Sequence, residues 1–99
     1  MAFTYDMEVK FSPDNPIKRG TRVDCEVRLV NIAGGEVAFV VAELPAYGMR
    51  HRLPMQGNVF STSIDVPMIA PRGSYDVHAY AVSTDRKKGP TKKMRIQIV

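Results

Sequence analysis

The chain has 99 residues, of which 44% are hydrophobic and 24% are charged, and its formal net charge is +4. This size and composition are typical of one globular domain and exclude an intrinsically disordered protein. No run of about 18 apolar residues occurs, so a membrane-spanning helix is excluded as well. The mild positive charge does not by itself predict nucleic-acid binding, because that requires cations concentrated on one face.

A period of two in the apolar residues predicts strands along nearly the whole chain. The first alternation, from Tyr5 to Phe11, is stopped by two prolines, which lack an amide donor. Residues 36–44 are almost continuously apolar, which is typical of a central strand covered on both faces. No window has the spacing of an amphipathic helix. In chain order, the predicted strands span residues 5–11, 23–29, 36–44, 49–55, 60–66, 75–81 and 94–98.

Seven short strands without a helix bury their apolar faces most readily as two packed sheets. We therefore expect an all-β fold, a seven-stranded immunoglobulin-like antiparallel β-sandwich, with residues 1–99 forming a single domain. A partly open barrel is the alternative, although such barrels usually have five strands. The strips expected to face each other in the core contain Val9, Phe11, Val23, Cys25, Val27, Phe39, Val41, Tyr75, Val77, Met94 and Ile96.

The last part of the chain resembles the F–G hairpin of immunoglobulin-like domains. It consists of residues 73–77, an alternation of small and apolar residues, a polar loop and a last apolar strand. In antibody domains a tyrosine stands at the corner before this strand, and Tyr75 occupies that place. Val77 takes the position of the usual cysteine, so Cys25 has no disulfide partner, and Phe39 is expected in the space of the usual tryptophan. These departures exclude an antibody-type domain. The chain is more similar to the bacterial and archaeal immunoglobulin-like modules of surface proteins, which are fibronectin III-like and adhesion-related.

Two further segments, 11–23 and 57–64, resemble the same modules. The resemblance implies a non-catalytic structural or interaction module of a larger cell-surface or secreted protein, whose partners are neighbouring domains of the parent chain. It implies an extracellular or cell-envelope location, although the lack of a signal peptide leaves a cytoplasmic one open. The chain would then be a monomeric domain excised from a longer protein, without membrane insertion.

An alternative function is that of an accessory domain of an extracellular enzyme, binding a polysaccharide or a protein. Such a domain needs exposed aromatic side chains, for which Tyr47 and Tyr80 are the candidates. His78 shares the strand face of Tyr80, opposite Tyr75, and would stack on a ligand or hydrogen-bond to it. A solvated cross-strand pair is the simpler interpretation of these two residues.

A third interpretation is a periplasmic copper-binding β-sandwich. Thioether and imidazole ligands suit Cu(I), and the spacing places Met49, His51 and Met55 on one strand face, with Met68 as a further candidate. Leu53 shares that face, which indicates instead that it points into the core, where methionine is a common filler. We therefore expect no bound metal and no cofactor, and keep these residues as candidates.

Residues 85–95 carry six cations, including Arg86, Lys87 and Lys88. Such a loop would suit phosphates, acidic glycans or an anionic surface, but it also fits a solvated loop that guards a sheet edge. It contains no aromatic residue on which bases could stack, so no nucleic-acid partner is expected.

Catalysis has no support in the sequence. Nucleophile elbows, phosphate-cradling glycine loops and zinc-protease motifs do not occur. Cys25 alternates with Val23 and Val27 on the core side of its strand, which predicts an inert thiol. We expect that the protein is not an enzyme.

Overall fold

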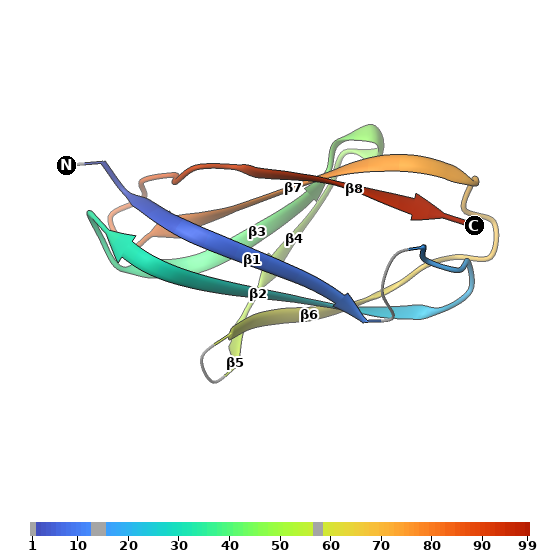
Figure 1. Ribbon diagram of the computed structural model, residues 1–99, viewed down its shortest axis with the longest axis horizontal. Helices are drawn as coiled ribbons and strands as arrows, with labels where there is room; N and C mark the ends of the chain where they lie inside the picture. Colours follow the sequence, from blue (N-terminus) through green and yellow to red (C-terminus); the bar gives the residue numbers. More distant parts are fainter. Residues whose placement is uncertain (1, 13–15, 57–58) are drawn as a thin grey trace.

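The computed structural model describes residues 2–12, 16–56 and 59–99. Two four-stranded sheets pack face to face, and neighbouring strands within each sheet are antiparallel (Figure 1). The alternation seen in the sequence forms these strands because each presents one apolar face to the opposite sheet. No helix in the described part of the chain is long and apolar enough to cross a membrane. The elements are β1 (Thr4–Ser12), β2 (Arg22–Ala33), β3 (Val37–Leu44), the short 3-10 helix η1 (Pro45–Tyr47), β4 (Met49–Leu53), β5 (Met55–Gln56), β6 (Val59–Asp65), β7 (Gly73–Ser83) and β8 (Lys92–Ile98).

The strand order is β1-β2-β6-β5 in one sheet and β4-β3-β7-β8 in the other. This confirms the immunoglobulin-like sandwich, with seven strands if β4 and β5 are counted as one interrupted strand. A continuous strand over 49–55 is wrong, because the chain leaves one sheet after Leu53 and enters the other at Met55. Pro54 lies at this change of sheet, where its missing amide donor costs no ladder bond, and its carbonyl accepts from Ser61 N at 3.2 Å.

The buried core joins residues of both sheets. Val27, Val40, Leu53 and Ala81 have no solvent exposure in it. Inward-facing residues of β1, β2 and β7 follow the predicted alternation. The buried members of this cluster are Phe3, Met7, Cys25, Val27, Val40, Ala42, Leu53, Phe60, Ala79 and Ala81.

Phe39 and Val41 lie on the outer face of their sheet, so their predicted place between the sheets, and that of Phe39 in the tryptophan space, is wrong, although Val41 is buried, as predicted. Their neighbours Val40 and Ala42 face the core instead. A register shift between Val37 and Phe39 sets this orientation. The outer face is nevertheless covered, because the Arg52 guanidinium lies 4.0 Å from the Phe39 ring centroid and Val41 pairs with Tyr80.

The Tyr5 hydroxyl ties β1 to the opposite sheet. It accepts a hydrogen bond from Ala81 N at 2.8 Å and donates one to the Pro90 carbonyl at 2.5 Å. Burial raises the pKa of Tyr5, partly offset by the bond from Ala81. Nearby along the same edge, Lys92 Nζ donates to the Met7 carbonyl at 3.0 Å.

Tyr75 forms the predicted tyrosine corner. Its hydroxyl donates to the carbonyl of Pro71, four residues upstream, at 2.7 Å. This bond fixes the entry of the chain into β7.

Candidate functional site

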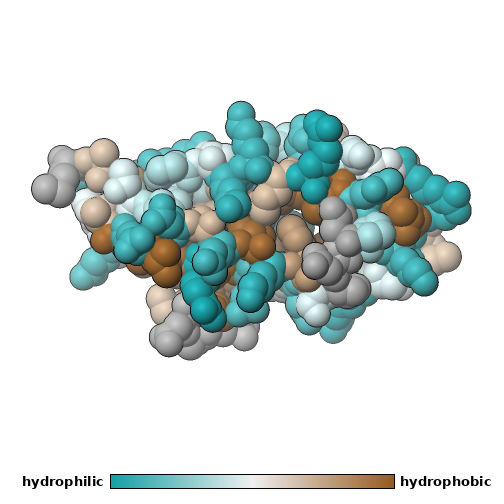
Figure 2. Space-filling model, in the orientation of Figure 1, coloured by the Kyte–Doolittle hydropathy of each residue, from teal (hydrophilic) through white to brown (hydrophobic). Residues whose placement is uncertain are grey.

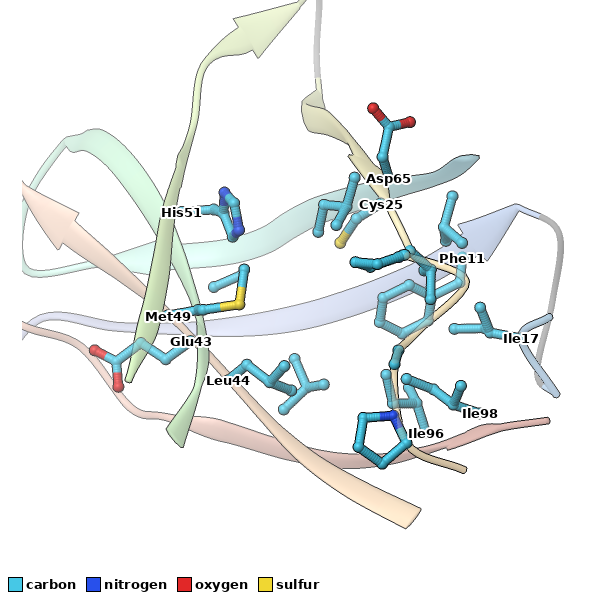
Figure 3. Close-up of a pocket in the computed structure, with 18 of the residues that line it drawn as sticks. Phe11, Ile17, Cys25, Glu43, Leu44, Met49, His51, Asp65, Ile96 and Ile98 are labelled. Atoms are coloured by element: carbon cyan, nitrogen blue, oxygen red, sulfur yellow. The ribbon is translucent and has the colours of Figure 1, made fainter. Parts of the chain in front are cut away.

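A cavity of about 320 Å³ lies between the two sheets, at the end of the sandwich away from Tyr5 (Figure 3). Both sheets contribute to its wall, and the segment 66–71 that joins β6 to β7 closes part of its rim. The lining is almost entirely hydrocarbon. It consists of Phe11, Ile17, Val23, Cys25, Ala42, Glu43, Leu44, Met49, His51, Ile64, Asp65, Val66, Pro67, Ile69, Ala70, Pro71, Val77, Ile96 and Ile98.

The wall comes from both sheets, with Ala42 of β3 and Val77 of β7 from one sheet and Val23 of β2 and Ile64 of β6 from the other. In the segment 66–71, Met68 and Ile69 are 69% and 90% exposed, so neither side chain is buried in the space between the sheets. In Figure 2 hydrophobic side chains emerge between rows of hydrophilic ones along the middle of the visible face.

Two carboxylates line the rim, and both have partners outside the cavity. Glu43 pairs with Arg50 at 3.1 Å and accepts from the Tyr80 hydroxyl at 2.9 Å. Asp65 pairs with Arg22 at 3.1 Å, where both side chains are exposed. These groups therefore leave the interior of the cavity apolar.

Cys25 contributes a buried thiol to the wall, and its side chain is only 2% exposed. Burial raises the pKa of this thiol to about 11. At neutral pH it is protonated and therefore neither a nucleophile nor a good metal ligand.

His51 points toward the same space from β4, across the cavity from Cys25 (Figure 3). Its Nε2 atom is buried and has no hydrogen-bond partner among the described residues. A buried polar atom without a partner is costly, so this nitrogen is the feature of the wall that most needs an explanation.

The copper candidates do not come together as a group. Met49 and His51 both line the cavity, whereas Met55 lies on β5 in the other sheet and is 59% exposed. The single strand face expected for the three residues is broken at Pro54. Among the described residues no group of three or more His, Cys, Asp or Glu side chains is placed to hold a metal ion.

The aromatic candidates are differently placed. His78 and Tyr80 share the outer face of β7 as expected, but Tyr80 is only 8% exposed. The Lys88 ammonium lies 4.3 Å from the Tyr80 ring centroid and covers it. Tyr80 is therefore not an exposed stacking platform. The side chain of Tyr47 lies outside what the structure describes.

Four of the six cations of residues 85–95 make local contacts in the structure. Lys87 pairs with Asp85 at 3.3 Å, and Arg95 pairs with Asp76 at 3.2 Å. Lys88 covers Tyr80, Lys92 bonds to Met7, and Arg86 adopts a positive φ of 67° at the turn.

Comparison with known proteins supports the fold. No protein-family model matches the chain, and no curated protein matches it in sequence. The structure is similar to a Niemann-Pick type C2 protein from the Japanese carpenter ant, with a TM-score of 0.58 and 11% identity, over 100% of this chain and 94% of that one. It is also similar to an endo-β-1,4-mannanase of Cellulomonas fimi, with a TM-score of 0.52 and 17% identity, over 95% of this chain.

An engineered protein gives a third match, with a TM-score of 0.52, 18% identity and 95% of this chain covered. This chain spans only 18% of the mannanase chain and 20% of the engineered one. At these identities the likeness concerns the fold alone.

Sequence reasoning did not identify the cavity. Met49 and His51 were singled out, but as metal ligands rather than as parts of an apolar wall. The remaining lining residues have the alternation of ordinary core positions. One signal in the sequence points to the cavity. Met68 and Ile69 are apolar residues in a segment bounded by prolines, outside the predicted strands.

Proposed function

We propose that this domain is a non-catalytic binding module that holds an apolar small molecule between its two sheets. The observation that carries the proposal is the cavity of about 320 Å³ with its hydrocarbon lining. This volume lies at the lower end of the range of ligand pockets, about 300–1,000 Å³. Apolar cavities of even half this volume bind small hydrocarbons.

The exposure of the cavity wall to solvent supports the proposal. The cavity is open on one side, so its hydrocarbon lining is in contact with water when no ligand is bound. A bound apolar molecule would remove this surface from water and make contacts with the wall, which is favourable by roughly 25 cal/mol for each Å² covered.

We further propose that the module belongs to a longer cell-surface or secreted protein and works beside neighbouring domains. Support comes from the mannanase, in which a similar fold makes up less than a fifth of the chain. No described contact favours the polysaccharide-binding or copper alternatives, because Lys88 covers Tyr80 and Met55 lies in the other sheet from His51.

The proposal is tested by titration with N-phenyl-1-naphthylamine, an uncharged probe whose fluorescence rises in apolar surroundings. We expect saturable binding of one probe per chain. Val77→Phe should fill the cavity and abolish binding while leaving the thermal midpoint unchanged or raised. Ala42→Leu fills the same space from the neighbouring strand, should Val77→Phe not fold.

Ile32→Phe is the matched control, because Ile32 is 44% exposed on β2 and does not line the cavity. It adds a similar bulk and should bind the probe as the wild type does. If the folded wild type gives no saturable signal, or if Val77→Phe and Ala42→Leu bind as the wild type does, no ligand is held between the sheets.

A further inference from the structure

The segment 66–71 places two apolar side chains in water at the rim of the cavity. Met68 and Ile69 are the most exposed of the large apolar side chains that the structure describes, and Ile69 also lines the cavity. We propose that this segment docks the domain on an anionic lipid bilayer, with both side chains at the boundary between head groups and acyl chains. This inference rests on the proposed function, since it names the surface from which an apolar ligand would enter the cavity.

The first argument is that hydrogen bonds hold the segment in place at both ends. At its start, the Val66 carbonyl accepts from Gly20 N at 2.7 Å, and Val66 N donates to the Thr21 carbonyl at 2.9 Å. At its end, the Pro71 carbonyl accepts from the Tyr75 hydroxyl at 2.7 Å. The exposed apolar surface of the segment is therefore a fixed property of the fold, and surface of this kind is typical of an interaction site.

The second argument is the charge beside the two apolar side chains. Segments 16–22 and 66–72 adjoin each other at the cavity end of the sandwich (Figure 1). Together they contain four cations and no acidic residue. One of the four, Arg22, pairs with Asp65. The other three form no ion pair within the part of the chain that the structure describes, and they are Lys18, Arg19 and Arg72.

These cations favour a surface of negative charge. Each lysine or arginine close to an anionic bilayer strengthens binding by about fivefold, and the contribution is lost at high salt. Apolar side chains and cations side by side match the two layers of such a surface, the acyl chains and the anionic head groups.

The third argument is the chemistry of the ligand. A molecule that suits a hydrocarbon-lined cavity dissolves poorly in water and collects in lipid bilayers. Docking through the rim would let this molecule pass between the bilayer and the cavity with little exposure to water. An acidic protein would match the cations but would not supply the ligand, so the bilayer is the partner that accounts for the apolar pair, the cations and the cavity together.

The first experiment places a fluorescent reporter in the segment. The chain contains no tryptophan, so a single introduced one gives an unambiguous signal. On vesicles of equal parts phosphatidylcholine and phosphatidylglycerol, the emission of Ile69→Trp should shift to shorter wavelength, because the indole enters apolar surroundings. Ile32→Trp is the matched control, since Ile32 is an exposed isoleucine near the other end of β2 from Arg22, and its emission should not shift.

The second experiment measures co-sedimentation with the same vesicles. Ile69→Ser should bind about tenfold more weakly than the wild type, whereas Ile32→Ser should bind as the wild type does. Arg72→Gln should weaken binding about fivefold. Arg28→Gln removes the same charge from an exposed site on β2 and should have little effect. Vesicles of phosphatidylcholine alone should bind more weakly than the mixed vesicles.

A folded wild type that does not bind the mixed vesicles would overturn the docking proposal, and so would equal emission shifts in Ile69→Trp and Ile32→Trp. Equal losses in Arg72→Gln and Arg28→Gln, with none in Ile69→Ser, would show adsorption by net charge and overturn it as well. Titration with N-phenyl-1-naphthylamine in the absence of vesicles tests the cavity separately. Saturable probe binding without vesicle binding would leave the binding function intact, whereas vesicle binding without probe binding would overturn that function and leave the docking surface.

Discussion

Among the described side chains, the hydroxyls of Tyr5 and Tyr75 hydrogen-bond to backbone groups, and removing each hydroxyl leaves a different backbone group without its partner. Tyr75→Phe removes one exposed bond to the Pro71 carbonyl, so water can replace it, and the free energy of unfolding should fall by about 1 kcal/mol. Tyr5→Phe also leaves the amide of Ala81 without its partner in a partly buried place, and should cost about 2–3 kcal/mol. Urea unfolding of both variants checks the order. An equal loss, or no loss in Tyr75→Phe, would contradict it.

Cys25 makes stability depend on alkaline pH. Burial raises the pKa of its thiol from 9.0 to about 11 in the folded state, so the unfolded chain loses this proton first as the pH rises. Stability is thus fully present below about pH 9 and falls between pH 9 and 11, by roughly 2 kcal/mol for this one group. Unfolding curves of the wild type and Cys25→Ala should therefore converge over that interval. Parallel curves would show that the thiol is solvated in the folded state.

At the scale of elements, the segment 66–71 is held against the turn before β2. Gly20 N donates to the Val66 carbonyl at 2.7 Å, and the Met68 side chain lies directly over Gly20. Gly20 has a φ of +74°, and a Cβ built there would lie 2.2 Å from Met68 Sδ. The contact therefore requires glycine for two reasons, the backbone conformation and the lack of a side chain.

Gly20→Ala should destabilise the domain more than Gly48→Ala does. Gly48 also has a positive φ, +62°, but a Cβ there would meet nothing within 4 Å. Both variants bear the strain of a left-handed alanine, about 1–2 kcal/mol. Only Gly20→Ala must also displace the Met68 side chain, which adds at most about 0.5 kcal/mol because that side chain is exposed and flexible. Thermal unfolding of the pair measures the difference. Equal midpoints would mean that Met68 is not packed against Gly20.

Sequence alternation predicted the strands well where polar and apolar residues contrast. In β1, β2 and β7 the inward and outward faces were correct, and so was the corner at Tyr75. In β3 the apolar run is continuous, so polar and apolar residues do not distinguish its two faces. Phe39 faces outward because of the register shift after Val37, which the sequence pattern does not show. The change of sheet at Pro54 was missed because residues on both sides of it keep the period of two.

The cavity was beyond prediction for a different reason. The alternation of polar and apolar residues predicts which side chains face the opposite sheet, but it does not predict the distance between the two sheets. Val23, Val77 and Ile98 have the pattern of core residues whether or not a gap separates them. Only His51 was noticed as unusual within such a face, because a histidine is chemically distinct from its neighbours.

At the scale of the whole molecule, occupancy of the cavity should be coupled to stability. A ligand that binds only the folded state at ten times its dissociation constant adds about 1.4 kcal/mol, which for a domain of this size raises the midpoint of thermal unfolding by several degrees. N-phenyl-1-naphthylamine should produce this shift in the wild type and in Ile32→Phe, but not in Val77→Phe. A similar shift in all three would indicate binding elsewhere on the surface.

The bonds from the Tyr5 hydroxyl and from Lys92 join the two sheets along one edge, near the end opposite the cavity. The sheets are also tied beside the cavity, because Ile17 N donates to the Gln97 carbonyl at 2.8 Å and Val99 N donates to the Ile17 carbonyl at 2.9 Å. A bound molecule would therefore leave past the exposed side chains of segment 66–71 without parting the sheets, so its dissociation rate should be independent of the global unfolding rate. Amide hydrogen exchange would show this as similar protection along β7 from Val77 to Ala81.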